Sequence, residues 1–85
     1  TSLDLRAARS LRTTLRKIAA TGVSLIVVTH HLPDILPEIR RVICLRDGRI
    51  IRDGDKEQVL TPASLAQVFG VQVEVVRQDG YYLAW

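Results

Sequence analysis

The feature that most constrains this chain is a short apolar, mostly β-branched run at residues 25–28, which ends in Thr29, His30 and His31. Runs of this kind are typical of strands that are buried on both faces, as in parallel sheets. We therefore predict a buried strand over residues 24–29, in an α/β fold that covers it with helices. Ligands in open α/β sheets bind at the carboxyl ends of the parallel strands, so the two imidazoles stand where a bound phosphate would lie.

An amphipathic helix is predicted before this strand. Asp4 is a suitable N-cap because its carboxylate can accept hydrogen bonds from the free amides of the first turn, and Gly22 is a typical stop. An apolar stripe repeats between them at three- and four-residue spacings, formed by Ala8, Leu11, Leu15, Ile18 and Ala19. A second stripe contains Arg9, Arg12 and Arg16. We interpret it as a solvated face, with docking onto a partner or onto nucleic acid as the alternative.

Short elements and turns are predicted after the strand. Pro33 suits the first turn of a short helix, which Pro37 must interrupt because proline has no amide hydrogen. Asp47-Gly48 is a strong hairpin signal, and Asp53-Gly54 predicts the next turn. The remaining predicted segments are strands at 41–46 and 49–52, a helical turn at 56–60, a helix at 61–69, a half-exposed strand at 71–75 and a returning strand at 81–85.

Composition restricts the class of protein. The chain has 85 residues and is 47% hydrophobic, which fits one small globular domain and excludes a disordered polar tail. No apolar run approaches the roughly 20 residues that span a bilayer. The single cysteine, Cys44, is interpreted as a buried hydrophobe, and it cannot form an internal disulfide. The net charge of +3 is weak evidence for a polyanionic partner.

Three motifs in order resemble the last third of an ATP-binding cassette (ABC) ATPase, the motor subunit of many membrane transporters. Thr1-Ser2-Leu3-Asp4 is similar to the D-loop of this family. The apolar run that ends in Thr29-His30 is similar to the strand before its switch histidine, and the sequence LRDGRI at residues 45–50 follows one short helix later. The resemblance covers residues 1–85, with the D-loop at 1–4, the H-loop at His30 and the C-terminal helix and hairpin at 61–85.

The resemblance implies a fold and a set of site residues. The fold would be the C-terminal fragment of a P-loop (RecA-like) ATPase domain, with one buried strand plus helices and two β-hairpins. His30 would be the catalytic and nucleotide-binding residue, because the switch histidine of the family contacts the γ-phosphate and helps to hold the attacking water. Asp4 and Ser2 would lie at the dimer interface, facing the phosphate-binding loop of the partner. His31 is interpreted as a surface residue or a subfamily feature.

Several motifs of the family precede the D-loop and are not among these residues: Walker A, the Q-loop, the signature motif and Walker B. The chain does not begin with methionine and starts inside a loop motif, so we expect a part of a longer protein. That parent would be an ATPase that binds ATP and Mg²⁺ between two ATPase subunits. It would drive membrane permease subunits from the cytoplasmic face of the inner membrane. The fragment alone is expected to bind neither ligand and to hydrolyse nothing.

The substrate and the partners are further expectations. The stretch from residue 59 to residue 71 is most similar to the branch that imports iron complexes, cobalamin or oxyanion metals, so a bacterial importer of a metal chelate is predicted. One alternative is a cassette ATPase that acts in translation or DNA repair. Another is a small basic module that binds nucleic acid through the arginine stripe, whereas the importer interpretation involves no nucleic acid. An unpaired edge beside residues 25–28 would favour self-association of the fragment.

Overall fold

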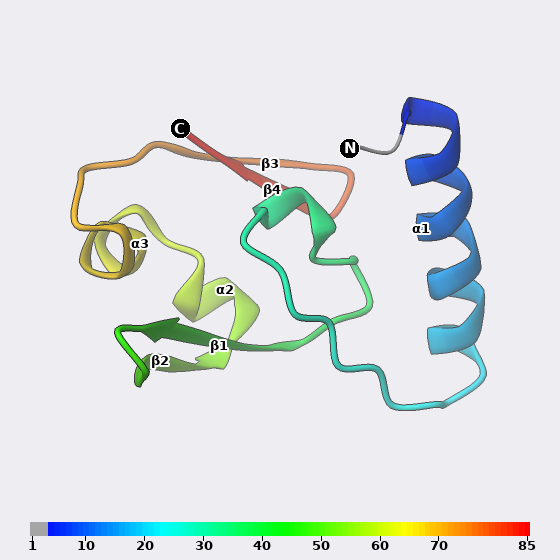
Figure 1. The fold of residues 1–85 in the computed structure, drawn as a ribbon, viewed down its shortest axis with the longest axis horizontal. Coiled ribbons are helices and arrows are strands. Elements are labelled where there is room, and N and C mark those ends of the chain that lie inside the picture. Colours follow the sequence, from blue (N-terminus) through cyan, green and yellow to red (C-terminus); the bar gives the residue numbers. More distant parts are fainter. Residues whose placement is uncertain (1–3) are drawn as a thin grey trace.

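A computed structural model describes residues 4–85, which form an α/β arrangement of helices and two antiparallel hairpins (Figure 1). This confirms the predicted α/β class with its two hairpins. In chain order the elements are α1 (Leu5–Ala20), the 3-10 helix η1 (Leu32–Asp34), β1 (Arg41–Arg46), β2 (Arg49–Asp55), α2 (Lys56–Val59), α3 (Pro62–Phe69), β3 (Val75–Gln78) and β4 (Tyr81–Ala84). The D-loop residue Ser2 lies outside the described residues.

The long helix α1 begins and ends as its sequence predicts. The side chain of Asp4 caps the first turn, because its Oδ1 atom accepts a hydrogen bond from the Ala7 amide at 2.7 Å. At the other end the Thr21 amide donates to the Ile18 carbonyl at 3.1 Å. Gly22 follows with φ of 90°, a backbone conformation that residues with a side chain rarely adopt.

The apolar stripe of α1 is only partly covered in the described part of the chain, because Ala8, Leu15 and Ala19 are half-buried whereas Leu11 and Ile18 are exposed. Figure 1 shows α1 standing to one side of the hairpins, and none of its residues is buried. Leu11 is 49% exposed and Ile18 is 37% exposed. The stripe therefore matches the predicted pattern, although no described element packs closely enough to bury it.

The predicted buried strand at residues 24–29 is wrong. The segment has no regular secondary structure and runs as a connection between α1 and η1 (Figure 1). Ile26 and Val28 are each 93% exposed, whereas Leu25 and Val27 are half-buried. A buried strand needs neighbours for its backbone hydrogen bonds and covering layers on both faces. Within residues 4–85 no strand pairs with this segment, and the face that carries Ile26 and Val28 is uncovered.

The core lies between the two hairpins and the two short helices. Helix α3 is fixed at both ends, because the Thr61 hydroxyl accepts a hydrogen bond from the Ser64 amide at 3.2 Å and Gly70 ends the helix with φ of 76°. Within this helix Leu65 lies in the core, with 1% of its surface exposed. The buried apolar cluster comprises Val42 of β1, Val59 of α2, Leu60, Leu65 of α3 and Tyr82 of β4.

The first hairpin agrees with the sequence at its turn and differs from it at its end. Asp47 and Gly48 form the turn with positive φ values of 52° and 73°, as the Asp-Gly signal predicts. The predicted turn at Asp53-Gly54 is wrong, because both residues belong to β2 and Gly54 pairs with Val42. The pairing that Val42 makes as part of the core outweighs the local turn preference. A β-bulge interrupts the register between the pairs of Cys44 with Arg52 and Leu45 with Ile50.

The second hairpin closes the chain. Asp79 and Gly80 form its turn, with φ values of 54° and 83°. The strand predicted at residues 71–75 starts only at Val75, although the backbones of Glu74 and Trp85 exchange hydrogen bonds of 2.9 and 3.1 Å just before it. Within residues 4–85, no helix is long and apolar enough to cross a membrane.

Candidate functional site

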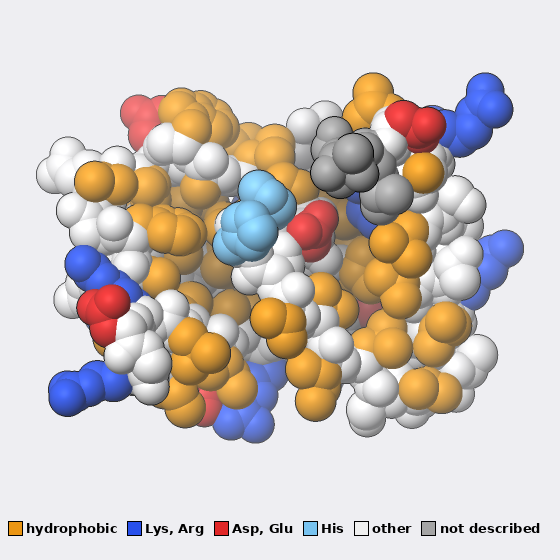
Figure 2. All heavy atoms as spheres, viewed as in Figure 1, with side chains coloured by type: hydrophobic (Ala, Val, Ile, Leu, Met, Phe, Trp, Pro, Cys, Tyr) orange, Lys and Arg blue, Asp and Glu red, His pale blue; other side chains and the backbone are white. Residues whose placement is uncertain are grey.

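The two histidines lie together on the surface, at the point where the connection from α1 reaches η1. His30 occupies a bend, and both imidazoles are exposed. Their ring centroids are 4.1 Å apart, with the ring planes tilted by 45°. Figure 2 shows the histidine side chains (pale blue) in the middle of one face, with hydrophobic side chains beside them. The structure therefore presents His30 to solvent, as a residue that contacts a ligand requires.

The backbone around the histidines is held by a hydroxyl–carboxylate contact. The Oγ1 atom of Thr29 donates to Asp34 Oδ2 at 2.6 Å and accepts a hydrogen bond from the His31 amide at 3.0 Å. Asp34 lies in η1, so one hydroxyl ties the bend to the short helix that follows. Sequence reasoning did not identify Asp34 as part of this site. Its place just after Pro33, in a first helical turn where a carboxylate is favoured, was the available signal.

An apolar hollow of about 510 Å³ lies next to the histidines. His30 and His31 form one side of it, and Phe69, Val71 and Trp85 contribute to the other. The last three side chains are 46%, 61% and 67% exposed. The hollow brings together η1, the connection after α3 and the end of β4, which are distant in the sequence. The sequence analysis did not predict it.

The second predicted site residue, Asp4, lies at the start of α1. Its carboxylate serves as the helix cap through the Oδ1 contact with the Ala7 amide. Among residues 4–85, no hydrogen bond or ion pair joins Asp4 to His30. The structure thus confirms the capping role and leaves the interfacial role as a prediction.

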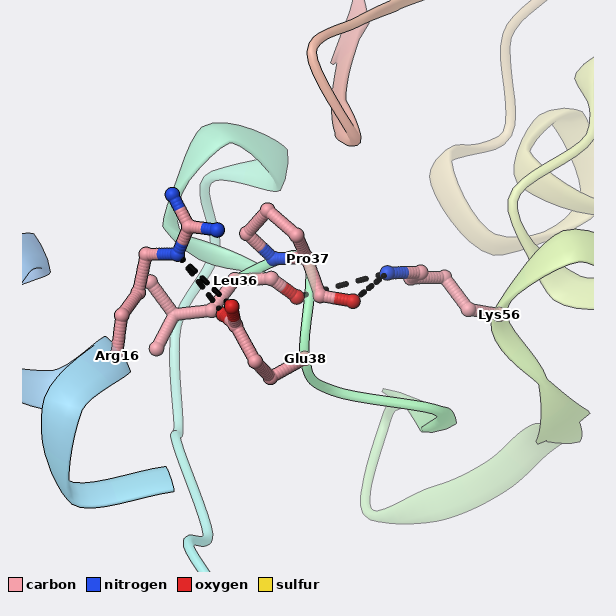
Figure 3. A network of polar contacts seen from close by, with 5 residues as sticks. All are labelled: Arg16, Leu36, Pro37, Glu38 and Lys56. Atoms are coloured by element: carbon pink, nitrogen blue, oxygen red, sulfur yellow. Dashed lines mark hydrogen bonds and ion pairs between the residues drawn. The ribbon is translucent and has the colours of Figure 1, made fainter. Parts of the chain in front are cut away.

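A polar junction lies on another side of the molecule. Figure 3 shows Pro37 and Glu38 held between Arg16 of α1 and Lys56 of α2. The Arg16 guanidinium forms an ion pair with the Glu38 carboxylate at 2.9 Å, which raises the pKa of Arg16. The Lys56 Nζ donates to the Pro37 carbonyl at 2.9 Å. Burial lowers the pKa of Lys56, and the nearby Arg77 guanidinium lowers it further.

The same junction borders a hollow of about 530 Å³ whose lining carries charges of both signs, among them Glu57 and Arg77. Arg77 lies 3.9 Å from the Glu57 carboxylate, and its guanidinium sits 5.1 Å from the centroid of the Tyr82 ring. Arg77 thus links the second hairpin to α2, whereas Arg16 links α1 to the segment after η1. The arginine stripe of α1 is also interrupted here, because Arg16 is engaged with Glu38 and Arg12 is half-buried.

The described residues offer little further chemistry. Within the range 4–85, no group of three or more His, Cys, Asp or Glu side chains is placed to hold a metal ion. Cys44 is a free thiol and half-buried, which agrees in part with its interpretation as a buried hydrophobe. Burial raises the pKa of the Cys44 thiol, so the reactive thiolate is disfavoured at neutral pH.

Comparison with known proteins identifies relatives that align with nearly the whole chain. No protein-family model matches it. The vitamin B12 import ATP-binding protein BtuD of Citrobacter koseri is 29% identical over 80 residues, which cover 94% of this chain and 32% of that protein. The proteins of the same name from Escherichia coli and Salmonella heidelberg are 30% and 29% identical over alignments of the same coverage.

The chain is similar to import ATP-binding proteins. It spans about a third of the length of these curated relatives. The motifs indicated a resemblance to the cassette ATPases of importers, and this similarity supports it. The relatives are themselves named as ATP-binding proteins. The similarity does not single out the metal-chelate branch.

Proposed function

We propose that this chain is the part of an importer's ATP-hydrolysing subunit that carries the switch histidine, His30. The observation that supports the proposal most is the similarity to vitamin B12 import ATP-binding proteins over 94% of the chain. The word "import" in the names of these relatives favours transport over a role in translation or DNA repair. The activity, the substrate and the partners of the whole subunit belong to the same proposal.

His30 would stabilise the phosphoryl group during its transfer from ATP. Protein groups promote this reaction mainly by placing hydrogen-bond donors where negative charge develops. An imidazole N–H serves as such a donor when its backbone is fixed and its ring reaches solvent. Both conditions hold for His30, because the contact between Thr29 and Asp34 fixes the bend and the ring is exposed.

Asp4 and Ser2 would lie at the interface with a second ATPase subunit. The cap contact of Asp4 uses its Oδ1 atom, which leaves Oδ2 available to a partner across an interface. The Mg²⁺ ion that accompanies ATP has no matching oxygen cluster in the described range, so these residues do not fit a magnesium site by themselves. We therefore assign the metal no ligand among residues 4–85, and its ligands would come from the remainder of the subunit.

The transported compound would be a metal chelate. The relatives are named for the import of vitamin B12, a cobalt complex, which fits this substrate class. The subunit would drive membrane permease subunits from the cytoplasmic face of the inner membrane.

A chimera tests the catalytic role of His30. The 80 aligned residues of the Escherichia coli relative are replaced by those of this chain, and ATP hydrolysis and ATP binding are measured. We expect His30→Ala in the chimera to lower turnover on the order of 10²-fold while ATP binding changes little, because one transition-state donor is lost. His31→Ala is the matched control, since it removes the adjacent exposed imidazole and should leave turnover nearly unchanged. Near-normal hydrolysis by the His30→Ala chimera would reject the catalytic role.

A further inference from the structure

Asp34 contacts the histidine segment twice, once through its side chain and once through its backbone. Its carboxylate oxygen Oδ2 accepts a hydrogen bond of 2.6 Å from the Thr29 hydroxyl. Its amide donates to the His31 carbonyl at 3.1 Å. All of these groups lie between residues 29 and 34, so the arrangement forms within one short segment and requires no residue from the remainder of a longer subunit.

The Asp34 carboxylate determines the direction of the Thr29 hydroxyl. A hydroxyl has one proton to donate, and an ionised carboxylate can only accept. The distance of 2.6 Å is typical of a hydroxyl that donates to a charged oxygen, which is one of the stronger kinds of hydrogen bond in proteins. The other acceptor near this hydroxyl, the His31 carbonyl, is 3.4 Å away. With the proton directed at Asp34, the lone pairs of Thr29 Oγ1 are free to accept the His31 amide at 3.0 Å.

The His31 amide belongs to the peptide group that joins His30 to His31. A hydrogen bond to this amide therefore fixes the peptide plane directly after the His30 Cα atom, and with it the direction in which the imidazole leaves the backbone. Thr29 holds the amide of His31, and the Asp34 amide holds its carbonyl. Neither contact uses the His31 ring, so the control variant His31→Ala keeps both.

We propose that Asp34 is a positioning residue for His30 and that it acts through the hydroxyl of Thr29. The inference rests on the proposed role of His30 in phosphoryl transfer. In this role Asp34 does not touch the substrate: its carboxylate orients the hydroxyl, and the hydroxyl holds the peptide group after His30. Small displacements of a correctly placed group cost much of its effect on the rate. Loss of this contact therefore lowers turnover without removing a group that binds ATP.

Turnover of the chimera with the Escherichia coli relative tests the role. Asp34→Ala removes the carboxylate but keeps the backbone contact with His31, so we expect turnover to fall on the order of tenfold while ATP binding changes little. Asp55→Ala is the matched control: it removes the same charge from an exposed aspartate whose side chain makes no cap hydrogen bond, and it should leave turnover unchanged. Thr29→Val should match Asp34→Ala, whereas Thr29→Ser keeps the hydroxyl and should retain most of the activity.

A double-mutant cycle and amide exchange distinguish positioning from general damage. If Asp34 acts through Thr29, the variant with both Thr29→Val and Asp34→Ala should lose no more turnover than either single variant. In the purified 85-residue chain, the His31 amide should exchange with solvent faster in both single variants than in the wild type. Its acceptor is removed in one variant and no longer oriented in the other. Asp55→Ala should leave this exchange unchanged.

The outcomes separate this inference from the proposed function. Loss of turnover in His30→Ala together with normal turnover in Asp34→Ala would overturn the positioning role and leave the proposed function intact. Additive losses in the cycle, or equal losses for Thr29→Ser and Thr29→Val, would also overturn the positioning role. Near-normal turnover of the His30→Ala chimera would reject the proposed function, and the positioning role would fall with it.

Discussion

Leu65→Ala tests whether the cluster around α3 is the element that holds the fold together. Leu65 is 1% exposed and belongs to the cluster that joins β1, α2, α3 and β4. The substitution removes three carbon atoms, and at about 0.8 kcal/mol each the lost transfer free energy is about 2.4 kcal/mol. The cavity left behind adds to this cost, so we expect the free energy of unfolding to fall by about 2–5 kcal/mol.

Such a loss is large for a chain of this size. A domain of 85 residues is typically stable by about 4–13 kcal/mol, at roughly 0.05–0.15 kcal/mol per residue. Urea unfolding followed by circular dichroism, at one fixed protein concentration, measures the change. With a denaturant slope of about 1 kcal/mol per molar urea, the midpoint should fall by about 2 M or more.

Ser64→Ala is the matched control, because Ser64 is the adjacent residue of α3 and is 6% exposed. Its hydroxyl is buried without a hydrogen-bond partner in the described range, and alanine is a better helix former than serine. This variant should therefore be as stable as the wild type or more stable. A loss for Leu65→Ala below about 1 kcal/mol, well under the range expected for a buried leucine, would refute the assignment of the core.

Three further outcomes are expected. Gly80→Ala should lower the unfolding midpoint more than Gly48→Ala does: both positions have positive φ, but an added Cβ at position 80 would lie 3.0 Å from the Pro37 Cβ, whereas at position 48 it meets nothing within 4 Å. Asp53→Asn should destabilise the chain near neutral pH, with the difference from wild type shrinking as the pH falls. Hydrogen bonds from Arg41 lower the pKa of Asp53, so this stabilisation is present above the ordinary aspartate pKa of about 3.9 and is lost as the pH falls through the lowered value. Equal midpoint differences at about pH 6 and about pH 2 would contradict that linkage. Isothermal titration of the chain with ATP and Mg²⁺ should show no saturable binding, because the loop and the metal ligands that hold phosphate are not among these residues.

The elements that the sequence predicted correctly are those that local chemistry determines. Asp4 and Gly22 set the ends of α1 through contacts within one turn, and Asp47-Gly48 makes a turn from the backbone preferences of two residues. Helix caps and tight turns depend on neighbours in the sequence, so their patterns are readable without the rest of the fold.

The predictions that failed depend on residues that are distant in the sequence. The run at 24–29 has the composition of a buried strand, but burial requires partners that composition cannot supply. Gly54 has the local signal of a turn, yet it pairs with Val42 because Val42 lies in the core. The hollow beside the histidines was missed for the same reason, because Phe69 and Trp85 line it from separate elements that are distant in the sequence. His30 was predicted at the carboxyl end of a buried strand and lies instead in a bend after an irregular segment, while its role remains a prediction.

His30 follows the exposed run directly, so whatever covers residues 23–28 also approaches the histidine. The bend itself does not depend on that cover, because Thr29, His31 and Asp34 hold it through contacts among themselves. The orientation of the backbone at His30 is therefore a local property of residues 29–34. Access to the imidazole, by contrast, depends on what pairs with the run before it. A segment built in this way can keep the backbone at His30 in one orientation while its surroundings change, which would suit the phosphate-sensing role proposed for this residue.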